Sequence, residues 1–547
     1  MFSRQKDLVK IGLPRDGFFK LGILVSILQG LSAVALLASS AWLISRAAEV
    51  NSIVYLGVAI VGVRGFAVGR ATFRYVERLL MHESAFRMLA EKRPQIFKAL
   101  TPFIPAGMVE RNRGETLSTV VSDVDELQNL PLRVIAPLAQ AIVVSIASVV
   151  FTWSLLPAAG VALALSLAGG FLVALSLSAR LSSRADLVIS PLKARIAEQS
   201  IDLLENQEVY LAYGWMSHQR ADFSATDIDL RKAQSRIAVA SGLGLSLFSI
   251  FGNFAMLSGA WFGANAVQEG AVPGAFLAVF MLLPMAVFEV VQAAQPVVSA
   301  WRRYRVSAAR VGELLNREVP LALDIESGEI ALDSFESLKI RTGSVRYPDS
   351  HRQAFSGLEL ELHRGEVVLL AGESGAGKSS VAMVLARLLN LEAGAFAING
   401  LEVSKYSMES VRSKIVYLEQ VPTVFLGDVR ANLALAKPGA MDGELIAALE
   451  AVGLWGMFSQ REGLSTFLGD RGVAISGGEA QRLALARAIL ASFEVLILDE
   501  PTANLDRVTA DSLIHDFVEI ARVSGRTILL ISHEERYRSL VDREIRL

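Results

Sequence analysis

Six apolar segments are long enough to cross a lipid bilayer, and they constrain the fold of this chain more than any other feature. A helix needs about 20 apolar residues to span a hydrocarbon core about 30 Å thick. The chain has 547 residues, of which 52% are hydrophobic, and its mean hydropathy of +0.43 is too apolar for an ordinary soluble protein. We therefore predict membrane-spanning helices at 17–45, 53–73, 131–153, 157–179, 238–264 and 272–300.

The charges between these segments predict the side of the membrane that each connection faces. The short connections Ala47–Ser52, Ser154–Ala158 and Asn265–Gly274 contain no Lys or Arg, whereas the N-terminus and the long connections 74–130 and 180–237 are rich in them. Because cytoplasmic loops carry the excess of Lys and Arg, both termini are expected in the cytoplasm. The first apolar run is also too long for a cleavable leader and has no small-residue cleavage site.

The composition changes after about residue 305. The long apolar runs end there, and the residues that follow have the composition of a soluble α/β domain. A polar, acidic stretch marks the change, so we expect a transmembrane domain at 1–310, a linker at 311–335 and a second domain at 336–547. The net charge of −2 gives no indication of nucleic acid as a partner. The chain has no cysteine, which excludes disulfides and cysteine metal sites.

Residues 372–379 read Gly-Glu-Ser-Gly-Ala-Gly-Lys-Ser, between a strand-like run and a helix-like run. This pattern and context predict a loop whose backbone N–H groups surround phosphate oxygens. Lys378 is expected to reach the β- and γ-phosphates of ATP, and Ser379 to offer its hydroxyl to Mg²⁺. The predicted nucleotide contacts are Gly372, Glu373, Ser374, Gly375, Ala376, Gly377, Lys378, Ser379 and Ser380.

Further residues with the chemistry of ATP hydrolysis follow apolar strands. The run Val495–Leu498 is expected to deliver Asp499 to the metal ion and Glu500 to the attacking water, which a carboxylate can orient and deprotonate. His533 follows another such strand and is expected near the γ-phosphate. Each residue alone would be ordinary, but their order and spacing predict an ATP hydrolase.

Two residues complete the predicted site. Gln420 follows a strand at 415–418 and is expected to contact both Mg²⁺ and a neighbouring domain. Tyr347 lies upstream and offers a ring that could stack on adenine. The predicted catalytic residues are Glu500, His533 and Gln420, and the predicted metal ligands are Ser379, Gln420 and Asp499.

With these motifs in this order, the region 336–547 resembles an ABC-transporter nucleotide-binding domain. Residues 475–479, Ile-Ser-Gly-Gly-Glu, are similar to that family's signature, 503–506 to its D-loop, and 466–472 to a motif that exporters carry just before the signature. The resemblance implies a membrane α-helical exporter half joined to an α/β P-loop domain. It also implies that the signature caps ATP held by another domain, through Ser476, Gly477, Gly478 and Glu479, with Glu479 standing where Gln is usual.

Two segments in the long connections resemble the segments that couple transport helices to the ATPase. They are Arg111–Ser118 and Asp202–Val209. Six spans and one ATPase make half of such a machine, and no internal repeat is visible. A second chain is therefore expected, together with contacts to membrane lipid and to a small-molecule substrate.

A basic stripe follows the second apolar span. Arg70, Arg74, Arg78 and His82 recur every four residues and so share one helix face. The alternative is an exposed basic extension that nearby glutamates neutralise. Deeper in the span lies Arg64, where charge is costly, and we expect Glu289 to be its counter-charge, in a polar cavity that Gln29 and Asn253 could share.

The segment that carries the stripe and two other sequence segments indicate a subfamily of these transporters. Residues 74–87, 40–46 and 123–133 resemble the CydC half of the heterodimeric CydDC exporters. This resemblance implies a CydD-like partner, the cytoplasmic membrane of a bacterium, export of small thiols such as cysteine or glutathione, and support of cytochrome bd assembly with a link to haem. We expect His82 to ligate haem, Met81 to be a second contact, and Arg74 or Arg78 to hold a propionate.

Two other functions remain open from the sequence. One is a lipid or drug exporter acting as a homodimer, which a wide apolar cavity would favour. A charged pair in the membrane argues instead for a polar or anionic substrate. The other is a haem-binding regulatory subunit whose ATPase serves signalling rather than transport.

Overall fold

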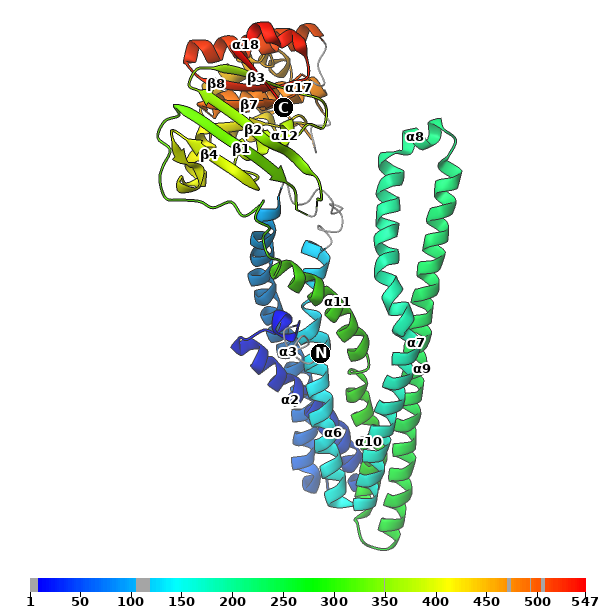
Figure 1. Cartoon of the computed structure of the whole chain (residues 1–547). Coiled ribbons are helices and arrows are strands. Elements are labelled where there is room, and N and C mark those ends of the chain that lie inside the picture. Colours follow the sequence, from blue (N-terminus) through cyan, green and yellow to red (C-terminus); the bar gives the residue numbers. More distant parts are fainter. Residues whose placement is uncertain (1–7, 105–118, 349, 470–473, 492, 503–506) are drawn as a thin grey trace. The chain divides into compact units, whose positions relative to one another are not determined.

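The computed structural model describes residues 8–104, 119–348, 350–469, 474–491, 493–502 and 507–547 (Figure 1). They form two compact units, with the boundary between Arg317 and Glu318, and the short turn η2 (Thr101–Phe103) belongs to the second unit. The stretch predicted as a linker contains the end of helix α11 and then residues that pack into the second unit. Leu323, Leu332 and Phe335 are buried in its core.

The first unit is helical, and five helical stretches among its described residues are long and apolar enough to cross a membrane. These stretches are Gly17–Ala47, Val54–Phe103, Val120–Leu155, Met216–Gln268 and Gly274–Leu315, and a shorter apolar stretch is Pro157–Val173. Each predicted span overlaps one of them, so the prediction of a multi-pass membrane protein is confirmed. The helices are α2 (Gly17–Ala47), α3 (Gly57–Leu100), α6 (Ala136–Leu155), α7 (Pro157–Glu205), α9 (Met216–Gln268), α10 (Leu277–Gln292) and α11 (Val297–Leu315).

Several helices are longer than a bilayer requires. Helix α3 has 44 residues, α7 has 49 and α9 has 53. At about 1.5 Å per residue each exceeds the hydrocarbon thickness of about 30 Å by a factor of two or more. Helices α7 and α9 run side by side and are joined at one end by the short helix α8 (Gln207–Ala212) (Figure 1).

Small residues set how closely the helices pack. A Cβ atom at Gly259 of α9 would clash with the carbonyl oxygen of Phe280 in α10, and one at Gly263 would lie 3.0 Å from the ring of Phe280. Glycine at these positions lets two backbones approach, which is a common basis of helix association in lipid.

A polar side chain fixes the start of α2: Asp16 accepts the N–H of Phe19 at 2.9 Å and so caps the helix.

A buried acid joins two segments of the helical unit. Asp123, in the short helix η4 (Thr119–Asp123), accepts the hydroxyl of Ser307 at 2.7 Å and lies 3.2 Å from a guanidinium nitrogen of Arg310. Both partners are on α11. Because a buried carboxylate needs such partners, the pair and the hydroxyl fix α11 against the segment that precedes α6.

The second unit has two sheets, and the larger one positions the nucleotide site. It is parallel, in the order β6-β7-β8-β3-β9, and its central strands are buried on both faces. Apolar side chains alternate between two cores: Leu369 faces one and Leu370 the other. Continuous apolar runs are typical of such strands. The strands are β3 (Val367–Ala371), β6 (Ile415–Leu418), β7 (Val495–Asp499), β8 (Thr527–Ile531) and β9 (Arg543–Arg546).

The smaller sheet is antiparallel, in the order β2-β1-β4-β5 (Figure 1). Its main strands β1 and β2 pair from Ser337 with His363 to Arg346 with Gln353. Its strands are β1 (Ser337–Arg346), β2 (Gln353–His363), β4 (Ala393–Ile398) and β5 (Leu401–Glu402). The helices that matter for the site are α12 (Lys378–Leu385), α17 (Gly477–Leu490) and α18 (Arg507–Ser524).

Candidate nucleotide-binding site

The predicted phosphate loop lies between the C-terminal end of β3 and the N-terminus of α12. Gly375 and Gly377 have φ angles of +84° and +96°, a region that residues with a side chain rarely adopt. A Cβ atom at Gly377 would also clash with the carbonyl oxygen of Ala354 on β2. The loop therefore needs glycine there both for its conformation and for its packing, and its N–H groups with the helix N-terminus suit an anion.

Lys378 is buried at the base of this loop. Its ammonium donates to the carbonyl oxygens of Gly372 at 2.9 Å and Glu373 at 3.0 Å. These bonds hold the charge next to the loop's N–H groups, where phosphate oxygens can replace the carbonyls as acceptors. The side chain is thus placed for the predicted role.

Asp499 ends β7 and is only 2% exposed. Burial raises the pKa of its carboxyl, while hydrogen bonds from Ser379 and Tyr417 act in the opposite direction. The Tyr417 hydroxyl donates to Oδ2 at 3.1 Å. A divalent cation would remove the cost of burying this charge. Carboxylate, hydroxyl and amide oxygens are the donors that Mg²⁺ prefers, so Asp499 and Ser379, with Gln420 lining the same cavity, fit that ion.

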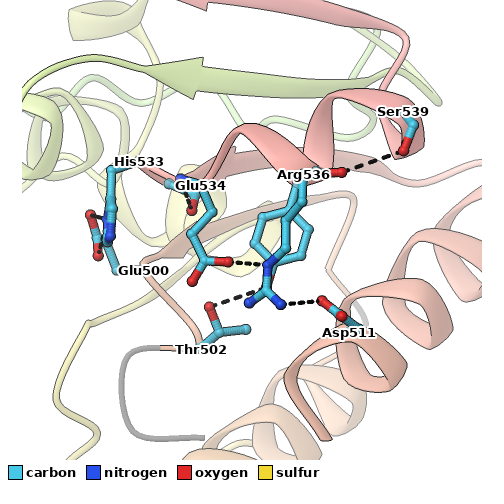
Figure 2. A network of polar contacts seen from close by, with 9 residues as sticks. Glu500, Thr502, Asp511, His533, Glu534, Arg536 and Ser539 are labelled. Carbon is cyan, nitrogen blue, oxygen red and sulfur yellow. Dashed lines mark hydrogen bonds and ion pairs between the residues drawn. The ribbon is translucent and has the colours of Figure 1, made fainter. Parts of the chain in front are cut away.

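Glu500 and His533, two of the predicted catalytic residues, are in contact, which the sequence analysis did not predict. Glu500 has a φ of +45°, unusual for a residue with a side chain, and its N–H donates to the carbonyl of Ile531 at 2.9 Å. The Nδ1 atom of His533 lies 2.9 and 3.0 Å from the two carboxylate oxygens of Glu500 (Figure 2). The strained backbone therefore aims the carboxylate at the histidine and the site, as a water-activating base requires.

One cavity of about 940 Å³ contains most of the predicted site. Tyr347 does not line it among the described residues; its hydroxyl lies 3.1 Å from Oγ of Ser380, so the stacking of its ring on adenine stays a prediction. The cavity also takes in Glu534, Arg538 and Arg546, which the sequence did not indicate. The predicted residues that line it are Gly372, Glu373, Ser374, Gly375, Gly377, Lys378, Ser379, Ser380, Gln420, Asp499, Glu500 and His533.

The signature residues do not line this cavity. Ser476 caps α17: its hydroxyl accepts the N–H of Glu479 at 3.3 Å, and Glu479 accepts the N–H of Ser476 at 2.7 Å. Glu479, the departure from the usual Gln, therefore has a capping role. Residues 503–506, the whole of the predicted D-loop, and 470–473, which contain the end of the motif before the signature, lie outside the described residues.

A polar network beside the contact of His533 with Glu500 extends from Glu534 to the neighbouring helix (Figure 2). Arg536 pairs with Glu534 and with Asp511 of α18, the latter at 2.8 Å, and donates to the Tyr537 hydroxyl at 3.0 Å. That hydroxyl donates to Thr502 at 3.4 Å. The network thus joins the segment after β8 to the segment after β7. Sequence reasoning missed both Arg536 and Tyr417, since no spacing rule pointed to either of them.

The charged residues of the helical unit pair differently from the prediction. Glu289 of α10 lies 2.9 Å from a guanidinium nitrogen of Arg70 on α3, so the predicted pairing with Arg64 is wrong. The two arginines are six residues apart on α3 and therefore point about 120° apart around that helix. Gln29 accepts the amide N–H of Gln140 at 2.6 Å. A polar cavity shared by Gln29 and Asn253 stays a prediction.

The basic stripe lies on an exposed face of α3. Arg74, Arg78 and His82 are all exposed, and the ring of His82 lies 5.9 Å from that of Phe86. Met81 is 1% exposed and packs in a cluster with Phe19 and Ala136. The prediction of Met81 as a second haem contact is therefore wrong, because the next residue of a helix points about 100° away.

Of the two predicted coupling segments, one can be placed. Arg111–Ser118 lies outside the described residues. Asp202–Val209 covers the end of α7 and the start of α8, where Asp202 accepts the side-chain N–H of Asn206 at 2.8 Å and the hydroxyl of Tyr210. Leu204 is 76% exposed at this turn. The segment is thus an exposed helical turn with an apolar side chain at its surface.

Known proteins share both parts of this architecture. Residues 19–289 match the ABC transporter transmembrane region, and 355–503 match the ABC transporter family. The chain is 32% identical over 94% of its length, and 90% of the relative's, to the glutathione/L-cysteine transport system ATP-binding/permease protein CydC of Escherichia coli (strain K12). The chain belongs to the CydC-type half-transporters of the ABC family.

Two other known proteins are similar to this chain, one in sequence and one in fold. The CydD protein of the glutathione/L-cysteine transport system of Bacillus subtilis (strain 168) is 28% identical over 94% of this chain and 89% of its own length. A bacterial Atm1-family ABC exporter with ATP bound has the same fold, with a TM-score of 0.81, 20% identity, and coverage of 97% of this chain and 93% of that chain. The protein is thus a multi-pass ABC exporter that couples ATP hydrolysis to transport and uses ATP with Mg²⁺.

Replacing Glu500 by Gln should retain ATP binding and reduce hydrolysis by about 10²- to 10⁴-fold, because only the water-activating carboxylate is lost. Lys378→Ala should instead weaken nucleotide binding. Glu519→Gln, an exposed change on α18, is the matched control and should hydrolyse ATP normally. Nucleotide binding and phosphate release, measured separately, distinguish the two effects. Normal hydrolysis in Glu500→Gln would show that another group activates the water.

Proposed function

We propose that this chain is one half of a heterodimeric exporter of small thiols, cysteine or glutathione-like, in a bacterial cytoplasmic membrane. Residues 1–310 would form the transport domain and 336–547 the cytoplasmic ATPase. The observation that carries the proposal is the similarity, along nearly all of the chain, to relatives named for glutathione and L-cysteine transport. The paired opposite charges of Arg70 and Glu289 support a polar substrate.

We infer that the ATP site is completed by a second chain, and the similarity to CydC-type and CydD-type relatives supports a partner of the CydD type. The cavity holds the phosphate loop, the metal ligands and the catalytic pair, but not Ser476 or its neighbours in the signature. We infer that the signature caps a nucleotide on the partner, and that the partner's signature caps the one at Lys378. Closure of two ATPase domains around ATP would then move the transport helices.

Transport by the purified pair of chains tests the main proposal. Reconstituted with the partner chain in inside-out vesicles, the protein should accumulate radiolabelled cysteine or glutathione in the presence of ATP. The Glu500→Gln variant of the same pair is the control and should transport neither. Accumulation of neither thiol by the wild-type pair, with ATP hydrolysis intact, would overturn the choice of substrate.

The arrangement of the two ATP sites can be tested at Ser476. Ser476→Ala should lower nucleotide occupancy at the partner's site and leave the Lys378 site occupied. Ser407→Ala is a matched control, because Ser407 also caps a helix of this domain, accepting the N–H of Ser410, and both changes remove a cap worth about 1 kcal/mol. Loss of ATP at the Lys378 site alone would contradict capping across the dimer.

A lipid or drug exporter is the second candidate function, and one observation favours it. An apolar cavity of about 490 Å³ lies between α2, α3, α6 and α10, with Phe66, Phe151 and Leu283 among its lining residues. Such a volume suits a small apolar molecule. Stimulation of ATP hydrolysis by lipids or apolar drugs, with no response to thiols, would favour this candidate.

A link to haem and to cytochrome bd assembly is a further part of the proposal. His82 is exposed on α3 in line with Arg74 and Arg78, and the structure shows no salt bridge to either arginine within the described part of the chain. An imidazole can ligate haem iron, and arginine suits propionate carboxylates. The residues present therefore fit haem, whether it regulates the ATPase or is transported.

Haem added to the purified protein should give a Soret band that depends on His82. The His82→Ala variant should lose the ligand-field signature and bind haem more weakly, because the axial ligand is gone. His218→Ala is the control, since His218 lies exposed on α9, outside the stripe. An unchanged spectrum and affinity in His82→Ala would remove this residue from the site and leave the stripe without a haem role.

A further inference from the structure

The ion pair between Arg70 and Glu289 joins two helices inside the stretches that can cross the membrane. The guanidinium nitrogen lies 2.9 Å from Oε1, with Arg70 on α3 and Glu289 on α10. Charge in this environment is costly, and the two residues together are neutral. In the chain by itself their side chains are 37% and 63% exposed. Both charges are thus accessible to a ligand, and ionisable residues within membrane-spanning stretches are candidates for binding a substrate.

Arg70 and Glu289 each follow, along their own helix, a residue that lines the apolar cavity of about 490 Å³. Phe66 lines the cavity one turn before Arg70 on α3, and Leu283 lines it less than two turns before Glu289 on α10. Ser32 of α2 approaches α3 beside the arginine, because a Cβ atom at Gly69 would lie 3.5 Å from its hydroxyl. Polar side chains thus come next to apolar cavity-lining residues on these helices.

Helices α2 and α6 show the reverse order of residues along the chain, and α2 runs antiparallel to α3, since Gly22 faces Met81 while Ser32 faces Gly69. Gln29 on α2 precedes the cavity-lining residues Leu31 to Trp42, and Gln140 on α6 precedes Ala147 to Phe151. The two glutamine side chains are hydrogen-bonded to each other. Four helices therefore place their polar residues on the same side of the cavity. This arrangement suits a small molecule with a charged head and a short, less polar side chain.

We propose that Arg70 and Glu289 bind the amino-acid head of the transported molecule. In a zwitterion the carboxylate and the ammonium are attached to one carbon, so each can reach one member of a pair whose own charges lie 2.9 Å apart. The guanidinium takes the carboxylate, and the glutamate takes the ammonium. One internal ion pair is exchanged for two to the ligand. The total charge remains zero before and after, which avoids an unpaired charge in the membrane.

The inference rests on the proposed export of thiols and deepens it. Cysteine has an α-ammonium and an α-carboxylate, and so does the γ-glutamyl end of glutathione. A site that binds this head would explain how one transporter accepts two thiols of different size. The adjoining apolar cavity then receives the less polar side of cysteine, while selectivity for the head resides in the two charges.

Analogues of cysteine that lack one charge test the site. The purified pair of chains in lipid nanodiscs is titrated with cysteine, glutathione, 3-mercaptopropionate, which has no ammonium, and cysteamine, which has no carboxylate; ATP hydrolysis is the readout. Wild type should respond to cysteine and glutathione. The two analogues should need at least about tenfold higher concentrations, because each leaves one charge of the site unpaired.

The two neutral variants should change this preference in opposite ways. Glu289→Gln no longer needs an ammonium, so its preference for cysteine over 3-mercaptopropionate should fall to about twofold or less, while cysteamine stays weak. Arg70→Gln no longer needs a carboxylate, so its preference for cysteine over cysteamine should fall in the same way, while 3-mercaptopropionate stays weak. Arg93→Gln is the matched control: Arg93 is also on α3 and pairs with Asp125 at 2.6 Å, away from the cavity, and should keep the wild-type order.

Variants that keep the charge guard against misfolding. Arg70→Lys and Glu289→Asp should retain the preference for zwitterions with a raised half-stimulating concentration, and the thermal midpoint of every variant is measured alongside. A wild-type order of preference in both neutral variants would overturn the site, even if their stability falls. If wild type responds to neither thiol, the proposed export of thiols is wrong, and so is the proposed binding of their amino-acid head. The two failures are thus distinguishable.

Discussion

The backbone of a membrane span must satisfy its own hydrogen bonds, and most of the helical unit follows from this constraint. Hydrocarbon offers no partner for an N–H or C=O group, so the apolar segments are helices. Once formed, α3, α7 and α9 continue well beyond the bilayer. Helix association then depends on close packing rather than on hydrophobic burial, which explains why Gly259 and Gly263 face Phe280.

The nucleotide site depends on a different rule, the convergence of parallel strands. The C-terminal ends of β3, β7 and β8 lie at one edge of the sheet, since these strands are neighbours in register. Lys378, Asp499, Glu500 and His533 follow those ends and therefore meet, although more than 150 residues separate the first from the last. The same rule places ligand sites at the carboxyl edge of open α/β sheets in general.

The free-energy cost of burying charge shapes a site in each of the two units. Asp499 is a carboxylate buried beside Lys378, and Arg70 and Glu289 are charges held within apolar helices. Each charge would be unfavourable alone, and each has a specific partner of opposite sign or a hydroxyl donor. Such groups are retained when a ligand uses them: a metal ion in the first case and, as we propose, the head of an amino acid in the second. Ligand binding can then replace one set of partners by another without leaving a charge unpaired.

The sequence by itself determined the membrane helices and the order of the ATPase motifs, because these depend on local patterns and on residues that follow strands. Each predicted span overlaps an observed helix, and the predicted residues Glu500 and His533 line one cavity. The partner of Glu289 was not determined in this way. Arg64 and Arg70 are both on α3, and only the rotation and tilt of that helix against its neighbours selects Arg70.

The tertiary structure also decided the roles of residues that no motif describes. Met81 is adjacent to His82 in sequence, yet it is buried against Phe19, because consecutive residues of a helix point in different directions. Arg536 joins Glu534 to Asp511, and Tyr417 donates to Asp499 across neighbouring strands. These contacts bring together residues far apart in the chain. Local sequence encodes which element a residue belongs to, whereas the packing of whole elements determines which side chains meet.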